Sequence, residues 1–318
     1  MISQPSRFTF WRLILAITAL LSWVSLRDAL NLAKALGISP LVSKTWLVLI
    51  AGLVITGGVS LILPVMSFFH WEAGFAKLID VMESASSHSP ASLWKKWLGW
   101  ALLILALITY PLFTFHPYYG ELLNNSDGVR LFIFWLISLT GMFACRLAIR
   151  NMNWASALLT MLLLQANLLR IALYLPDISA YPFSMGWSET SRFYYPALFY
   201  SKAIFGQSLP WPILHPTLHF TLLPPYLFNA PLWFHRLWQV FIRFLLVGLI
   251  APALVNRVNL PSRSARWLVG VWIFLMLFTL PLYLHLAVPV FIILWGFSTH
   301  NHRRTWLWLA VASVWAGL

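Results

Sequence analysis

The sequence predicts an all-α polytopic membrane protein with about nine transmembrane helices and one large outer loop of short amphipathic helices. Of the 318 residues, 60% are hydrophobic and only 9% are charged, and the mean hydropathy is +0.79. The apolar runs are continuous rather than alternating, which favours helices over a membrane β-barrel. Nine of the nineteen prolines fall within residues 176–235, and that density excludes a continuous helix there.

The transmembrane helices are predicted from the length of the apolar runs, since about 20 residues are needed to cross a bilayer. The nine candidates are residues 9–26, 46–69, 97–115, 131–149, 154–175, 237–256, 267–283, 286–298 and 305–318. The seventh and eighth are short and contain Pro281 and Pro289, so we expect a tight helical hairpin. The ninth reaches the last residue of the sequence, and we expect the C-terminal core to be incomplete.

These runs suggest two domains. Residues 1–153 hold four spans and a cytoplasmic amphipathic segment, 70–96, in which charged and apolar residues are mixed. Residues 154–318 form a second membrane domain that contains the outer loop 176–235.

The distribution of Lys and Arg predicts the orientation in the membrane. With the N-terminus in the cytoplasm, twelve lie on the cytoplasmic side and four on the opposite side outside the large loop. The positive-inside rule therefore places residues 176–235 outside an integral membrane protein, which we expect in a prokaryotic plasma membrane. We attribute the net charge of +13 to this asymmetry and expect membrane lipid, not nucleic acid, as the partner.

The outer loop is too aromatic for a solvated linker, so we expect short helices on the membrane surface with their rings at headgroup depth. Its two acidic residues are Asp177 and Glu189. Glu189 lies among aromatic residues, where a carboxylate can act as a general base or bind a divalent cation, Mg²⁺ or Mn²⁺. The alternative is an ion pair with Arg192, three residues later. Asp177, beside a proline, is either a turn residue or a second metal ligand.

Histidines and intramembrane polar residues are further candidates for binding metal or substrate. His215 and His219 have a four-residue spacing that can bind metal on a helix, but Pro216 makes His215 an N-cap position instead. Asn167 and Arg170 lie late in the fifth predicted span, and Arg243 lies early in the sixth. Two arginines at matched depth would bind a lipid phosphate between them. The alternative is that each arginine extends separately to the membrane surface.

The order of motifs in the loop resembles the GT-C membrane glycosyltransferases, such as the protein O-mannosyltransferase and aminoarabinose transferase relatives. An acidic residue, an aromatic helix, a glycine turn and a His-Pro motif follow a hydrophobic span. In chain order these are Glu189, Phe193-Tyr194-Tyr195, Gly206 and His215-Pro216-Thr217-Leu218. The sequence departs from the family pattern in having one acid rather than a pair, and Thr217 in place of a second proline.

In that family the loop acid is the catalytic base or a metal ligand, and the donor is a polyprenyl-phosphate-linked sugar. The resemblance therefore implies a cell-envelope hexosyltransferase with a GT-C-like core. It implies that Glu189 is catalytic and that Tyr194 and His215 bind substrate together with the intramembrane residues.

Three alternatives remain open from the sequence. A lipid transporter or flippase would show discontinuous helices and inverted repeats, and we find neither. An O-antigen-ligase-like enzyme would depend on Arg and His residues of the outer loop rather than on Glu189. A non-catalytic membrane scaffold would use the aromatic loop as a partner surface.

Overall fold

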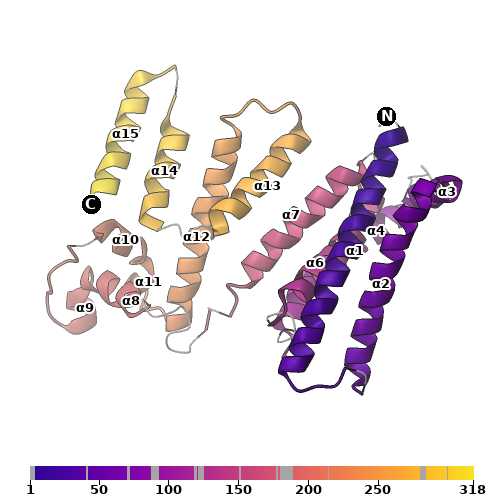
Figure 1. Cartoon of the computed structure of the whole chain (residues 1–318). Helices are drawn as coiled ribbons and strands as arrows, with labels where there is room; N and C mark the ends of the chain where they lie inside the picture. The colour runs from indigo at the N-terminus through magenta and orange to yellow at the C-terminus, as the bar shows by residue number, and fades with distance from the viewer. Residues whose placement is uncertain are drawn as a thin grey trace. The chain divides into compact units, whose positions relative to one another are not determined.

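The computed structural model describes a chain whose regular elements are all helices. The described residues are 4–40, 42–69, 72–86, 93–117, 120, 125–149, 152–176, 178–179, 189–213, 215–279, 284–298 and 300–318. Within these ranges no strand forms (Figure 1), which confirms the all-α prediction. The chain divides inside one helix into two compact units, Met1–Gln165 and Ala166–Leu318. The sequence placed its domain boundary slightly earlier, at residues 153/154.

Six helices in the described part of the chain are long and apolar enough to cross a membrane. They are α1 (Gln4–Ala35), α2 (Lys44–Phe69), α4 (Leu93–Phe115), α6 (Asp127–Ala148), α7 (Trp154–Ala172) and α12 (Leu232–Val255). These helices correspond to the first six predicted spans.

The last three predicted spans are helical but short. They are α13 (Arg263–Thr279), α14 (Leu284–Gly296) and α15 (His302–Gly317), with 17, 13 and 16 residues. At 1.5 Å per residue these helices measure about 20–26 Å, less than the ~30 Å hydrocarbon core. The predicted count of nine spanning helices is therefore not confirmed.

The first helix is longer than predicted, because α1 continues through Arg27 and Asp28 to Ala35. Asp28 has a structural partner: its carboxylate accepts a hydrogen bond from the backbone N–H of Gly128 at 2.9 Å. Together with Ser126, whose hydroxyl accepts from the N–H of Val129, it satisfies the exposed backbone donors where α6 begins. Hydropathy alone would end the span near Asp28, but in the structure its carboxylate binds the start of α6.

The interior of the first unit combines apolar packing with a few buried hydrogen bonds. The indole N–H of Trp135 donates to the hydroxyl of Thr18 at 2.9 Å. Gln165 is fully buried, and its side-chain oxygen accepts from the hydroxyl of Ser138 at 3.1 Å. These polar side chains are thereby satisfied within the protein, as a membrane interior requires.

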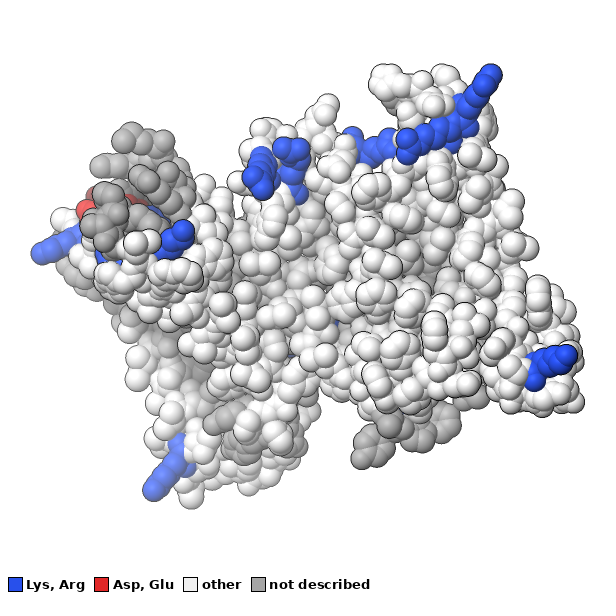
Figure 2. Space-filling view, turned by 180° about the vertical axis from the view of Figure 1, so that it is seen from behind, with Lys and Arg blue, Asp and Glu red and all other residues white. Residues whose placement is uncertain are grey.

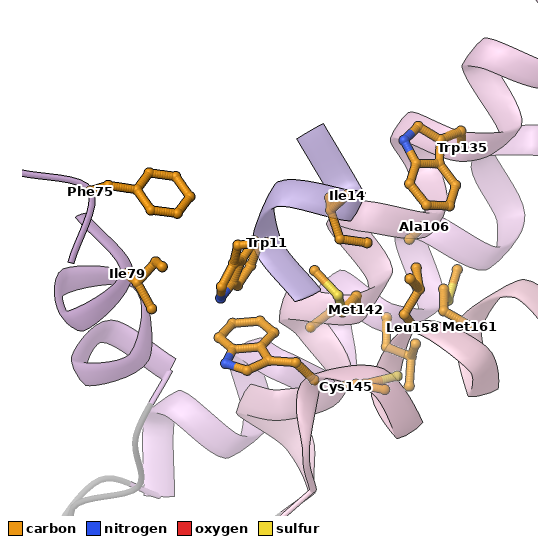
Figure 3. Close-up of a cluster of buried hydrophobic side chains, with 14 residues drawn as sticks. Trp11, Ile14, Phe75, Ile79, Ala106, Trp135, Met142, Cys145, Leu158 and Met161 are labelled. Carbon is orange, nitrogen blue, oxygen red and sulfur yellow. The ribbon is translucent and has the colours of Figure 1, made fainter. Parts of the chain in front are cut away.

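The predicted amphipathic segment 70–96 contains a helix, α3 (Glu72–Ser86). Its apolar face is buried, with Phe75 and Ile79 each 1% exposed. Figure 3 shows both side chains pointing toward Trp11 of α1. The structure thus shows a helix in this segment, whereas its position at a membrane surface stays a prediction.

The second unit is built on α12, against which α13 and α14 pack, and α14 pairs with α15. Arg257, at the end of α12, donates to the backbone oxygens of Leu294 and Phe297 at 2.6 and 2.7 Å, so it caps the C-terminus of α14. Figure 2 shows Lys and Arg gathered along the edge formed by the ends of α12, α13 and α15. The sequence assigned the arginines of these connections to one side of the membrane, and the fold brings them to one end of this unit.

Candidate functional site

The described residues of the segment 176–235 form short helices, as predicted, and these helices belong to the second unit. They are α8 (Glu189–Leu198), α9 (Ser201–Phe205), α10 (Pro216–Thr221) and α11 (Pro224–Leu227). Proline begins α10 and α11, where its fixed φ suits the first helical position and its missing N–H costs nothing. Gly206, with φ 73°, ends α9 in the left-handed conformation typical of a helix terminus.

Partly buried hydrogen bonds connect these short helices to one another and to α12. The hydroxyl of Tyr226 donates to the backbone oxygen of Phe193 at 2.5 Å, and burial raises the pKa of Tyr226 to about 12. The indole N–H of Trp238 in α12 donates to the backbone oxygen of Thr221 at 2.9 Å. The four short helices therefore pack against one another and against α12.

Two arginines converge on a single tyrosine ring in this unit. The guanidinium carbon of Arg170, near the end of α7, lies 5.6 Å from the ring centroid of Tyr174. The guanidinium carbon of Arg243, in α12, lies 5.7 Å from the same centroid. The two guanidiniums are therefore no more than about 11 Å apart.

The backbone positions of the two arginines are less closely matched than the sequence suggested. Because α12 begins at Leu232 rather than at residue 237, Arg243 lies eleven residues into its helix, about 16 Å along the axis. Arg170 lies only two residues before the end of α7. Helical side chains lean toward the N-terminus of their own helix. In two spans joined by one loop, that lean directs Arg243 toward the loop and Arg170 away from it, so the side chains meet.

Aromatic packing holds the shared tyrosine ring in place. Tyr174 contacts Phe278 of α13 edge to face, with centroids 5.1 Å apart. Phe278 is 1% exposed and lies 5.8 Å from the guanidinium carbon of Arg243. The set Arg170, Tyr174, Arg243 and Phe278 is called the arginine–aromatic cluster below. Each cation lies against an aromatic ring, a contact that stabilises a guanidinium by about 0.5–2 kcal/mol.

The cluster is electropositive, and a third arginine adds to it. Arg192, one turn after the start of α8, lies close enough to Arg243 for their charges to repel, as does Arg170. The Nε of Arg170 is buried and has no hydrogen-bond partner among the described residues. The two acids of this unit are Asp177 and Glu189, and the side chains of both lie outside the described part of the chain.

His215 occupies the predicted N-cap position of α10 but has an unusual backbone. Its φ and ψ are 50° and 52°, and its side chain makes no capping hydrogen bond. A non-glycine residue rarely adopts this left-handed conformation, and a residue before proline is normally extended. The strained backbone brings its imidazole to 5.1 Å, centroid to centroid, from that of His285 in α14.

The remaining predicted site residues lie apart from these groups or outside the described structure. Asn167 is buried, and its side-chain nitrogen donates to the backbone oxygen of Val271 at 3.5 Å, so it connects α7 to α13. Tyr194 is half-exposed on α8 and contacts Tyr195 and Phe205. Glu189 is the first residue of α8.

The predicted metal ligands, Asp177 and the side chain of Glu189, lie outside the described residues. Among the residues that the structure does describe, no group of three or more His, Cys, Asp or Glu gathers to hold a metal ion. His219 packs against Tyr195 with centroids 4.9 Å apart, while His215 packs against His285. The divalent cation stays a prediction.

Several residues of the site were missed by sequence reasoning. Tyr174 was detectable, because it follows Arg170 by four residues and so lies on the same helical face. His285 comes just before a predicted span, and no motif of the sequence indicates a role for it. Arg236, at the start of α12, is fully buried and donates to the backbone oxygen and the hydroxyl of Ser179. Its hydrogen bonds to Ser179, which the sequence does not predict, assign Arg236 a structural role.

Comparison with protein-family models, with curated proteins and with solved structures finds no match. The residues and their geometry are therefore the whole basis for assigning a function.

Proposed function

We propose that this protein is a membrane glycosyltransferase that moves a sugar from a polyprenyl-phosphate-linked donor to an acceptor on the outer face. One observation carries the proposal, namely that Arg170 and Arg243 contact the same Tyr174 ring from two helices long enough to span a membrane. A chain that partly buries two guanidiniums within about 11 Å of each other incurs repulsion and desolvation that an anion between them relieves.

Phosphate is the anion that fits this arrangement best. The planar guanidinium fork binds two oxygens at once, and two forks on either side can share one phosphate group. Both arginines belong to apolar helices, so a phosphate carried on a lipid reaches them without leaving the membrane. A polyprenyl-phosphate sugar has that form, with the tail in lipid and the sugar on the side of the outer loop.

Glu189 is the proposed catalytic base. It begins α8, and Arg192 of the same helix is within electrostatic range of Arg243. The helix that carries Glu189 therefore also carries a charge that acts on Arg243. In the proposed reaction, Glu189 accepts a proton from the acceptor hydroxyl, whose oxygen attacks the anomeric carbon. The bond from that carbon to the phosphate oxygen breaks, and the two arginines stabilise the charge that develops on the phosphate.

Binding of undecaprenyl phosphate to the purified protein in lipid nanodiscs tests the phosphate site. Arg170→Lys or Arg243→Lys keeps the charge and removes the fork, and should weaken binding at least about tenfold. This follows because a hydrogen bond to a charged group contributes about 1.5–3 kcal/mol and 1.4 kcal/mol is a factor of ten. Arg266→Lys is the matched control, because Arg266 is exposed at the opposite end of this unit. Equal affinity in all four proteins would refute the phosphate site.

The transfer step is tested separately with Glu189→Gln, which should abolish sugar transfer and leave undecaprenyl phosphate binding intact. Near-normal turnover in that variant would favour a second candidate, a transferase that resembles O-antigen ligases and uses Arg and His. The contact between His215 and His285 is the specific observation in favour of that candidate. Loss of transfer in His215→Ala, with Glu189→Gln active, would establish it instead.

A further inference from the structure

A pocket of about 380 Å³ opens beside α9, at the part of the loop that the proposed donor site does not use. Its lining residues are Phe199, Tyr200, Ser201, Lys202, Ala203, Ser208, Leu209 and Trp211. All of them come from one continuous segment of thirteen residues. A pocket of this size is near the lower end of the range for small-molecule sites, about 300–1,000 Å³.

The pocket is preformed by the backbone. Gly206 reverses the chain after α9 because it adopts the left-handed conformation, with φ 73°. The chain that follows Gly206 is then held against α9, since the backbone N–H of Leu209 donates to the hydroxyl of Ser201 at 3.0 Å. Ser201 is only 6% exposed, so this hydrogen bond is protected from water. The ring of Trp211 lies 5.5 Å from that of Phe199, which closes the two ends of the segment.

The lining combines aromatic faces with polar groups. Trp211 is 70% exposed and Tyr200 is 39% exposed, so each ring offers a free surface. The electron-rich face of such a ring attracts the C–H groups of a sugar ring. The hydroxyls of Tyr200 and Ser208 can donate to and accept from sugar hydroxyls. A lipid tail would leave these polar groups without partners, and a purely polar solute would not use the rings.

The charge of the pocket selects among saccharides. Lys202 is exposed and is the one charged residue of the lining. Its ammonium group favours a ligand with a carboxylate or phosphate. We propose that this pocket binds an anionic saccharide, and, given the transferase function proposed above, that this saccharide belongs to the acceptor.

The exposed aromatic residues of the loop have another use, which is to anchor it in the membrane–water interface. Phe228 is 78% exposed and lies outside the pocket lining. An interfacial anchor requires only such exposure, whereas a saccharide site requires the particular residues of the pocket. Phe228→Ala is therefore a matched control for Trp211→Ala.

The test uses the purified full chain in nanodiscs and a panel of acidic glycans, each paired with its neutral counterpart. Digalacturonate and its methyl ester form the central pair, because the ester removes the carboxylate charges and keeps the sugar rings and their hydroxyls. We expect the wild-type protein to bind digalacturonate and Trp211→Ala to bind it at least about tenfold more weakly. Lys202→Met should bind the acid and the ester equally, and Phe228→Ala should resemble the wild type.

Two results would overturn the proposal. One is an absence of saturable binding to any acidic glycan of the panel. The other is an equal loss in Phe228→Ala and Trp211→Ala, which would assign both rings to the membrane interface. Undecaprenyl phosphate binding measured on the same preparations separates this proposal from the function on which it rests. If lipid-phosphate binding still depends on Arg170 while glycans do not bind, only the acceptor pocket fails.

Discussion

The close approach of α4 to α6 gives the sharpest prediction about stability. At Gly99 in α4, an added Cβ would lie 2.5 Å from the backbone nitrogen of Ala148 and 2.7 Å from the carbonyl carbon of Leu147. Both atoms belong to the backbone of α6, so no side-chain rotation relieves the overlap. Gly99→Ala therefore forces the two helices apart by several tenths of an ångström or more.

The expected magnitude follows from two opposing effects. Overpacking of a close contact costs about 1–3 kcal/mol, and the gap that opens along the two helices reduces their dispersion contacts further. The gain in helix propensity from glycine to alanine offsets about 1 kcal/mol. We expect Gly99→Ala to be destabilised by about 1–2 kcal/mol. At Gly52 in α2 nothing lies within 4 Å of the added Cβ, so Gly52→Ala should be neutral or stabilised by up to about 1 kcal/mol.

Thermal unfolding in detergent micelles, followed by near-ultraviolet circular dichroism, measures both variants. Gly99→Ala should unfold at a lower temperature than the wild type, and Gly52→Ala at the same or a higher temperature. If Gly99→Ala is as stable as Gly52→Ala, the backbones of α4 and α6 are not in contact at this position. The packing described for the first unit would then be wrong.

Two further predictions concern charged groups. Asp28→Ala should lower stability by about 1–2 kcal/mol, because it removes the acceptor for the N–H of Gly128 at the start of α6. The control Asp127→Ala removes an exposed ion pair and should cost less than about 1 kcal/mol. Equal losses of stability in the two variants would contradict the capping role of Asp28. Burial, and then the nearby His215, lower the pKa of His285 from its ordinary value of 6.5. Because the folded state resists protonation of this group, its stability is complete above pH 6.5 and falls as the pH drops below that value. Thermal unfolding at pH 7.5 and 5.5 should show a smaller loss in His285→Phe than in the wild type, and an identical loss would exclude His285 as its source.

Local sequence patterns were sufficient to predict much of the fold. The apolar runs located the six helices that are long enough to cross a membrane, because burial in lipid depends on composition over about 20 residues, which hydropathy measures directly. The prolines predicted short helices in 176–235, since each one limits φ and removes a donor at its own position. His215 was placed at the start of a helix by Pro216, and α10 begins there.

Other predictions failed because a partner distant in sequence decided the outcome. The helix α1 continues past Arg27 because α6 supplies a backbone donor to Asp28 from a hundred residues away. The last three predicted spans, of 17, 13 and 14 residues, form helices of 17, 13 and 16 residues, and the end of α14 is capped by Arg257, which follows α12. Hydropathy cannot detect such partners.

The sequence by itself determined that the chain is helical and suited to a membrane, and it identified Arg170 and Arg243 as the intramembrane charges that need an explanation. Only the tertiary structure decided that both meet at the ring of Tyr174, and that the imidazole beside His215 belongs to His285 rather than to His219. The physical reason is that apolar burial is set by residues near in sequence. Contacts between side chains depend instead on the directions in which distant helices pack, and a single sequence contains no local signal for those directions.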